Sequence, residues 1–168
     1  MKRAFIILLF TVALFMFTAC SLKTESTATA NVPNPVTEYK SVEEINRAAD
    51  FDVLMLPEDL GYIAVKLNLI DRNIAEVEYI RDGDDGVDIW TRQAKGKSDI
   101  SGIYGVDYQE EQFNSLTVNK GRYENTDDNT LIMVAWFTDA DYSYSLNATG
   151  INSASFDEII RTMTTRSK

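Results

Sequence analysis

Apolar and polar side chains alternate along much of the chain, which is the pattern of strands in a sheet with one buried face. The alternating stretches are residues 63–69, 75–79, 87–91, 116–123 and 142–148. In the first stretch, the side chains predicted to face the core are Ile63, Val65, Leu67 and Leu69. Residues 131–137 (LIMVAWF) are apolar throughout, which is typical of a central strand covered on both faces.

Two segments combine apolar residues at helical spacing with a capping box, a Ser followed three residues later by Glu. The first covers residues 41–50 and begins with Ser41 and Glu44. The second begins with Ser155-Phe156-Asp157-Glu158 near the C-terminus. Its apolar stripe consists of Phe156, Ile159, Ile160 and Met163. We therefore predict two short helices.

A helix with one apolar stripe needs a sheet face to cover. The sequence therefore predicts the α+β class: one curved antiparallel sheet of about six strands, with two short helices packed on one face. Residues 95–114 interrupt the alternation with Gly96, Gly102 and Gly105. We expect a long loop or flap with a short strand in this segment.

The N-terminus carries a different pattern. Lys2 and Arg3 precede an uncharged apolar run over residues 4–18, which is shorter than the roughly 20 residues that span a bilayer as a helix. A run of this length behind a basic start is typical of a secretory signal peptide. Two alternatives are an uncleaved anchor and cleavage after Ala28-Thr29-Ala30, which lies far beyond the run.

The run ends in Phe17-Thr18-Ala19-Cys20, which resembles the bacterial lipoprotein signal. In that signal, small residues precede a cysteine that is diacylated and becomes the new N-terminus; Phe17 stands where the family most often has Leu. Cys20 is the only cysteine of the chain, and lipidation would give it a role. We expect residues 1–19 to be removed and Cys20 to anchor the protein on the extracytoplasmic face of the cell membrane.

Residues 21–38 are rich in Thr, Ser, Ala and Asn and show no apolar periodicity. Such a composition is typical of a disordered linker. We therefore predict three parts: a signal peptide over residues 1–19, a lipidated cysteine with a tether over residues 20–38, and a single folded domain over residues 39–168.

Composition narrows the functions open to this domain. The 168 residues include no His and one Cys, which excludes His-dependent catalytic triads, His metal sites, thiolate zinc clusters and internal disulfides. After removal of residues 1–19, 14 basic and 26 acidic side chains leave a net charge of −12, which argues against a nucleic-acid partner. We expect no enzymatic activity, no cofactor and no metal.

An acidic cluster formed by Asp82, Asp84, Asp85 and Asp88 offers carboxylate oxygens of the kind that Ca²⁺ prefers. Its spacing departs from that of a calcium-binding EF-hand loop, because a Gly takes one ligand position and Gln93 stands where the bidentate Glu belongs. We therefore interpret the cluster as a solvated hairpin turn.

Three aromatic residues are candidates for a ligand-binding face: Trp90, Tyr104 and Tyr108. Trp90 falls on the face opposite Ile89, so it is either exposed or packed under the C-terminal helix. We favour packing in the core over a binding role. Trp136 lies in the strand that is apolar on both faces, and we expect it in the core.

The order of several short motifs resembles a family of bacterial extracytoplasmic domains of unknown function. The motifs are Leu56-Pro57, Gly61-Tyr62, Val134-Ala135-Trp136, Tyr142/Tyr144-Ser-Leu146 and Ser155-Phe156-Asp157-Glu158-Ile159-Ile160, over roughly residues 50–165. This family occurs in Gram-positive lipoproteins and at the C-terminus of some membrane-bound anti-sigma factors. The resemblance implies a surface-facing sensory or binding domain without known catalytic residues.

Two functional hypotheses follow. The first is a tethered binding or sensory module that meets an envelope protein or polymer through strand edges and the loop over residues 95–114. The second, suggested by a weaker likeness to lipoprotein-carrier proteins, is a carrier that holds a lipid or other apolar ligand between sheet and helices. A carrier needs small inward side chains, whereas Met133 and Trp136 are large. We therefore favour the binding module.

Overall fold

The computed structural model describes residues 35–81 and 83–167, without the side chains of residues 84–87. The predicted signal peptide, Cys20 and residues 21–34 of the predicted tether lie outside these ranges. The described part combines two α-helices with one open antiparallel sheet of eight strands. The α+β prediction is confirmed, but the expected number of about six strands is too low.

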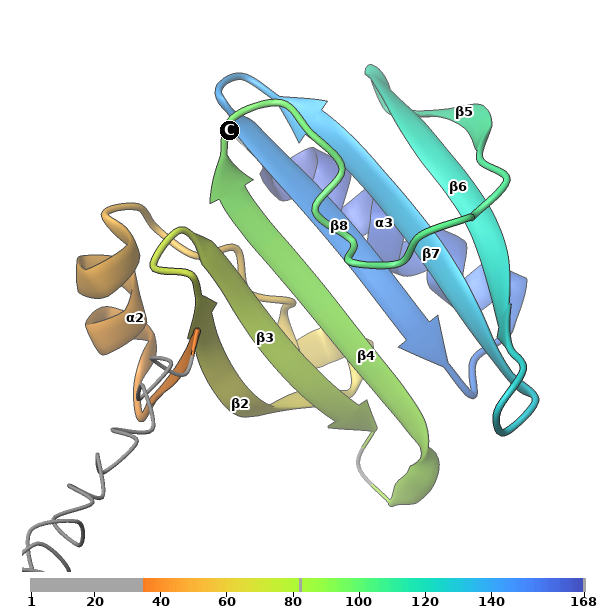
Figure 1. The fold of residues 1–168 in the computed structure, drawn as a ribbon, viewed down its shortest axis with the longest axis horizontal. Coiled ribbons are helices and arrows are strands. Elements are labelled where there is room, and N and C mark those ends of the chain that lie inside the picture. The colour runs from red at the N-terminus through yellow and green to blue at the C-terminus, as the bar shows by residue number, and fades with distance from the viewer. Residues whose placement is uncertain (1–34, 82, 168) are drawn as a thin grey trace, which may run out of the picture. The chain divides into compact units, whose positions relative to one another are not determined.

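The sheet consists of two four-stranded meanders. The first contains β1 (Val36–Tyr39), β2 (Tyr62–Ile70), β3 (Ile74–Arg81) and β4 (Asp84–Lys95). The second contains β5 (Gln109–Phe113), β6 (Leu116–Asn125), β7 (Thr130–Asp139) and β8 (Tyr142–Thr149). Pairing of β4 with β8 joins them in the order β1-β2-β3-β4-β8-β7-β6-β5 (Figure 1).

The edge strands account for the low strand estimate. At one edge, β1 has three exposed residues and belongs to the sheet although its first residues, Val36 to Glu38, lie in the predicted tether. At the other edge, β5 has the mostly polar sequence QEEQF. Edge strands bury little apolar surface, so the apolar alternation that reveals inner strands is weak or absent in them.

The capping boxes of the two helices differ in outcome. In α2 (Val42–Ala49), the Ser41 Oγ accepts a hydrogen bond from the Glu44 amide (3.3 Å), and the Glu44 carboxylate accepts one from the Lys40 amide (3.1 Å). The box predicted at Ser155 is wrong. Helix α3 (Ser153–Arg166) is capped by Asn152, whose Oδ1 accepts from the Ser155 amide (2.9 Å).

The two faces of the second meander have different covers. Helix α3 lies behind β6, β7 and β8, whereas residues 96–108 cross in front of them (Figure 1). We call residues 96–108 the strap, the side of the sheet that they cross the strap face, and the opposite side the helix face. The strap confirms the loop predicted over residues 95–114. Strand β5, which follows the strap, is the short strand expected in that segment. It also explains why β7 is buried on both faces, as predicted.

The helix face holds the apolar core. The stripe of α3 is buried as predicted, with Phe156, Ile159 and Ile160 at 0% exposure and Met163 at 2%. Ile45 of α2 belongs to the same core cluster. The segment that follows α2 contributes further core residues and contains the short 3-10 helix η1 (Glu58–Leu60).

A β-bulge in β2 changes which residues face the core. Pairing between β2 and β3 shifts between Ala64 and Lys66, so that Val65 is an extra residue and the inward and outward positions exchange. Leu67 is buried as predicted, but Ile63 and Val65 are 48% and 46% exposed. The prediction that these two side chains face the core is therefore wrong.

Candidate functional site

The strap face carries uncharged and charged polar side chains in adjacent rows of β2, β3, β4 and β8. These residues are Asn68, Glu76, Arg92, Ser143, Ser145 and Asn147. All except the half-buried Arg92 are buried. The alternation of residues 142–148 predicted strand β8 but not this burial, because polar residues on an alternating strand normally face solvent. The only signal in the sequence is that the outward residues of β8 are small and uncharged.

Arg92 holds the strap to the sheet. Its Nη1 donates hydrogen bonds to the carbonyl oxygens of Ile100 (3.2 Å) and Ser101 (2.8 Å). Its Nε and Nη2 each lie 2.7 Å from Oε2 of Glu76, whose side chain is only 10% exposed. The guanidinium therefore neutralises a nearly buried carboxylate and fixes the middle of the strap at the same time.

Two residues of β8 hold the first half of the strap. The Ser143 hydroxyl donates to the Gly96 carbonyl (2.9 Å) and accepts from the Ser98 amide (2.8 Å). Further along β8, the Asn147 Nδ2 donates to the Ser101 carbonyl (2.8 Å). Side chains of the sheet thus contact the backbone of the strap, so these contacts do not depend on strap side chains.

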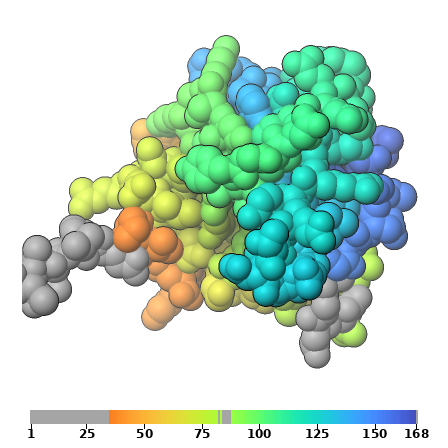
Figure 2. Space-filling view, turned by 45° about the vertical axis from the view of Figure 1, so that its right-hand side comes forward, coloured from red at the N-terminus to blue at the C-terminus, as the bar shows by residue number. Residues whose placement is uncertain are grey.

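Two glycines allow the strap to lie close to the sheet. A Cβ at Gly102, where φ is +73°, would overlap the Nη1 of Arg92. On β6, a Cβ at Gly121 would overlap the side chain of Val106. Figure 2 shows the strap in green, packed over this side of the molecule next to the cyan β6 and β7.

The end of the strap is held by Tyr108. Its ring packs edge-on against Trp136 of β7, with 6.4 Å between ring centroids. Its hydroxyl donates to Oδ2 of Asp99 (3.0 Å) and lies 3.2 Å from the Ser101 Oγ. Burial, together with the Asp99 carboxylate, raises the pKa of Tyr108 to about 12, so the phenol is protonated at neutral pH.

The three aromatic residues predicted to line a binding face all lie on the strap side. Trp90 is half-buried on β4, opposite Asn147 of β8, so it does not pack under α3. Tyr104, within the strap, is 89% exposed. Tyr108 is half-buried against Trp136, which is itself half-buried on the strap face rather than enclosed in the apolar core.

Away from the row of Asn68, Glu76 and Arg92, apolar side chains of the first meander are exposed on the strap face. Ile63 and Ile80 are paired across β2 and β3 and are 48% and 39% exposed. Ile80 and Val65 line a pocket of about 350 Å³ together with Trp90. The ion pair between Lys66 and Glu78 (2.7 Å) borders it. We call Ile63, Val65, Ile80 and Trp90 the open patch.

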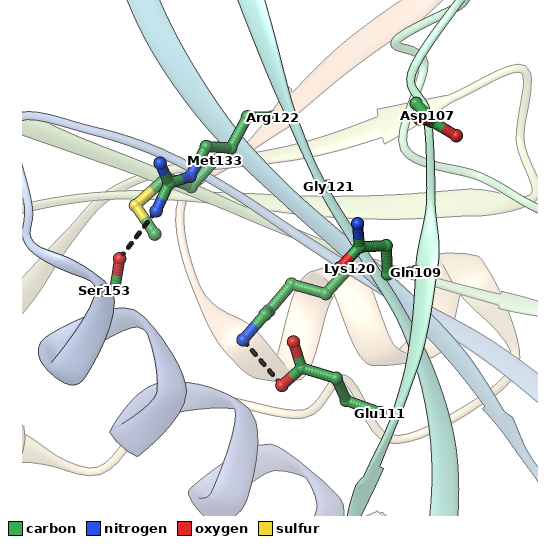
Figure 3. A pocket seen from close by; sticks show the side chains of 8 residues that line it. All are labelled: Asp107, Gln109, Glu111, Lys120, Gly121, Arg122, Met133 and Ser153. Atoms are coloured by element: carbon green, nitrogen blue, oxygen red, sulfur yellow. Dashed lines mark hydrogen bonds and ion pairs between the residues drawn. The ribbon is translucent and has the colours of Figure 1, made fainter.

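A larger pocket, of about 550 Å³, lies between β5, β6 and the start of α3 (Figure 3). Lys120 Nζ lies 2.7 Å from Glu111 and 3.0 Å from Asp157, and Arg122 donates to the Ser153 hydroxyl (3.0 Å). Burial lowers the pKa of Lys120, but its two carboxylate partners outweigh this and raise the pKa above its usual value. These contacts pair Lys120 with two carboxylates and join α3 to the sheet.

The space between the sheet and the helices is filled. Large side chains of both helices are completely buried there, including Ile45, Phe156 and Ile160. The gap beside Met163, lined also by Val53 and Tyr144, is too small to admit a water-sized molecule. This gap therefore admits no ligand, whereas the pocket of about 550 Å³ beside the start of α3 is lined mainly by polar and charged residues.

The acidic cluster can be assessed only in part. A turn at Gly83 joins β3 and β4, as expected for a hairpin. The side chains of Asp82, Asp84 and Asp85 lie outside the described residues, so the calcium alternative is not tested. Among the side chains that the structure does describe, no group of three or more acidic residues or cysteines is arranged to hold a metal ion.

Within the described ranges, no helix is long and apolar enough to cross a membrane. The membrane anchor predicted at Cys20 precedes these ranges. Comparison of the chain with protein-family models, with curated proteins and with solved structures finds no match. The resemblance to the extracytoplasmic family therefore stays a prediction from the sequence.

Proposed function

We propose that this protein is a membrane-anchored bacterial lipoprotein of the cell envelope, whose extracytoplasmic domain is a non-catalytic binding or sensory module. Binding takes place on the strap side of the sheet, where an envelope protein or polymer contacts the open patch and the edge of the strap. Cys20 provides the anchor, as its place after the apolar run indicates.

The observation that carries the proposal is the position of the exposed apolar side chains. Ile63, Val65 and Ile80 are each at least 39% exposed; Val65 and Ile80 line one pocket with Trp90, and Ile63 is paired with Ile80. Contiguous apolar side chains on the surface of a folded domain are typical of interaction sites. The complete burial of Phe156, Ile159 and Ile160 between sheet and helix supports this module over the alternative of a lipid carrier.

Site-specific photo-crosslinking on intact cells tests the binding face. A photoreactive amino acid at position 80 should give a discrete crosslinked product, because Ile80 lies in the open patch. The matched control is position 131 on β7, since Leu131 is 49% exposed but belongs to the opposite face. Equal crosslinking at both positions, or none at position 80, would contradict the proposed face.

The anchor is tested by Cys20→Ser. Two or more acyl chains attach a protein stably, since each buried CH₂ contributes about 0.8 kcal/mol. The variant should leave the membrane fraction and appear in the soluble fraction, whereas Ser21→Ala, as a neighbouring control, should stay with the membrane. Sedimentation of Cys20→Ser with the membranes would contradict lipid anchoring.

A further inference from the structure

Polar atoms without a partner gather beneath the strap. Among the described residues, the buried side-chain atoms that make no hydrogen bond are Trp136 Nε1, Ser145 Oγ and Asn147 Oδ1. Ser145 is paired with Trp136 across β7 and β8, and Asn147 lies two residues further on the same face. Buried polar atoms in native proteins are nearly always hydrogen-bonded. Their concentration under one cover therefore indicates a binding site.

The three atoms define the hydrogen-bonding groups that would complement them. The Trp136 Nε1 is only a donor. Because the Asn147 Nδ2 already donates to Ser101, its free Oδ1 needs a donor. The Ser145 hydroxyl can serve as either. A hydroxyl group both accepts and donates, so adjacent hydroxyl groups fit this arrangement better than an isolated acceptor or donor.

The surroundings favour a neutral ligand. Arg92, the nearest cation, is neutralised by Glu76 at 2.7 Å and also holds two strap carbonyls. A charged ligand would therefore find no free counter-charge in the Arg92–Glu76 pair. Burying an unpaired charge is strongly unfavourable. The rings of Trp136 and Tyr108 supply apolar surface beside the polar atoms. Hydroxyl groups alternating with C–H surface are the chemistry of a saccharide.

We propose that the strap is a reversible cover over a site for a neutral saccharide. The inference rests on the proposed binding function and specifies its ligand class. When the strap lifts, the donors that hold the Ile100 and Ser101 carbonyls, on Arg92 and Asn147, bind ligand oxygens instead. The ligand hydroxyls also satisfy Ser145 and Trp136, which the closed strap leaves without partners. This gain offsets the loss of the strap contacts.

The two tryptophans provide a direct assay. In Trp90→Phe, Trp136 is the only tryptophan left, and its indole lies at the site. We would titrate this variant, as the full chain in detergent, with two neutral trisaccharides, maltotriose and chitotriose. We expect at least one of them to change the Trp136 emission saturably, with glycerol as the control for a general solvent effect.

Two serines of β8 make a matched pair. In the Trp90→Phe background, Ser145→Ala removes a ligand contact and should weaken binding about tenfold, the equivalent of one hydrogen bond. Ser143→Ala instead removes two strap contacts, to Gly96 and Ser98. It favours the open strap and should therefore tighten binding. A merely structural effect would weaken binding in both variants.

Three outcomes would overturn the inference. The first is no saturable response to either trisaccharide up to about 10 mM, a weak limit for a specific site, with the chain still unfolding cooperatively. The second is equal weakening by Ser143→Ala and Ser145→Ala. The third is a destabilising Ser145→Ala without any trisaccharide response, which would indicate that water alone serves these atoms. If crosslinking at Ile80 persists in these cases, only the saccharide site fails and the proposed function stands.

Discussion

The two faces of the sheet are covered in physically different ways. On the helix face, α3 buries Phe156, Ile159 and Ile160 completely against apolar strand residues. On the strap face, the cover is a backbone segment held by hydrogen bonds from Arg92 and Asn147. Apolar burial is non-directional and spread over many atoms, whereas the strap depends on a few directional contacts.

The two covers are suited to different roles, the helix to stability and the strap to recognition. A helix whose stripe is buried cannot leave its face without exposing large apolar side chains to water. Lifting the strap would expose Val134, which is completely buried, but the β8 groups beneath the strap, such as Ser145 and Asn147, are polar and water can solvate them. We therefore expect the helix face to stabilise the domain and the strap face to provide the surface that changes on binding.

The largest expected effect is on the helix face. Phe156→Ala removes a completely buried ring and should lower the free energy of unfolding by about 3–5 kcal/mol. Urea denaturation followed by circular dichroism measures this. Leu131→Ala, at a position that is 49% exposed, is the control and should change the free energy much less. A loss below about 1 kcal/mol for Phe156→Ala would refute the assignment of the core to this face.

Compared with Phe156→Ala, Arg92→Met should reduce stability less but loosen the strap more. The variant leaves the Glu76 carboxylate without its cation and the Ile100 carbonyl without its donor, while the Ser101 carbonyl keeps only the donor of Asn147. It should lower stability by about 2–3 kcal/mol. Trypsin cleavage after the exposed Lys97 should become faster than in Phe156→Ala under native conditions.

The double variant Arg92→Met/Glu76→Leu separates the two contributions of Arg92. It removes the unpaired carboxylate, so it should recover part of the lost stability. The Ile100 and Ser101 carbonyls still lack the hydrogen bonds from Arg92, so fast cleavage after Lys97 should persist. Recovery of both properties would mean that the ion pair, and not the strap contacts, accounts for the effect of Arg92.

The smallest effect concerns alkaline pH. An ordinary tyrosine has a pKa near 10, and burial raises the pKa of Tyr108 on the strap face and of Tyr144 on the helix face to about 12. Because the folded state holds these protons more tightly, their contribution to stability is fully present below pH 10 and is lost as the pH rises toward 12. Urea unfolding between pH 8 and pH 12 measures the loss.

Phenylalanine variants assign this loss to each face. Tyr108→Phe and Tyr144→Phe should each show a shallower fall in stability above pH 10 than the unchanged chain. Because Tyr108 packs against Trp136, ionisation of Tyr108 at alkaline pH should expose the Trp136 ring. Only Tyr108→Phe should reduce this exposure. Identical pH profiles for all three proteins would show that neither phenol is responsible.

The parts of the fold that the sequence predicted are those with strong local periodicity. Strand β7 is apolar at every inner position and is buried on both faces, and the stripe of α3 lies on the core. The predictions failed where local pattern and tertiary pairing disagree. The bulge at Val65 turns Ile63 outward, and the polar strand β5 is held by pairing with β6 and contributes only Phe113 to the core.

The candidate site was predicted less completely than the fold. The sequence singled out Trp90, Tyr104 and Tyr108, which do share the strap side, because aromatic residues among glycines stand out locally. It did not single out Arg92 or Asn147. Asn147 contacts Ser101 across 46 residues of sequence, and Arg92 contacts it across nine residues that have no regular period, so no local pattern records either contact.

The sequence by itself determined the α+β class, the positions of the inner strands along the chain and two amphipathic helices, because hydrophobic period and capping act over a few neighbouring residues. Only the tertiary structure decided that the strap crosses the sheet opposite α3, that polar side chains of β8 are buried beneath it, and that Ile63 and Ile80 share an exposed patch. These features depend on strand register and on contacts between segments far apart in the chain, and a pattern of single residues carries no information about either.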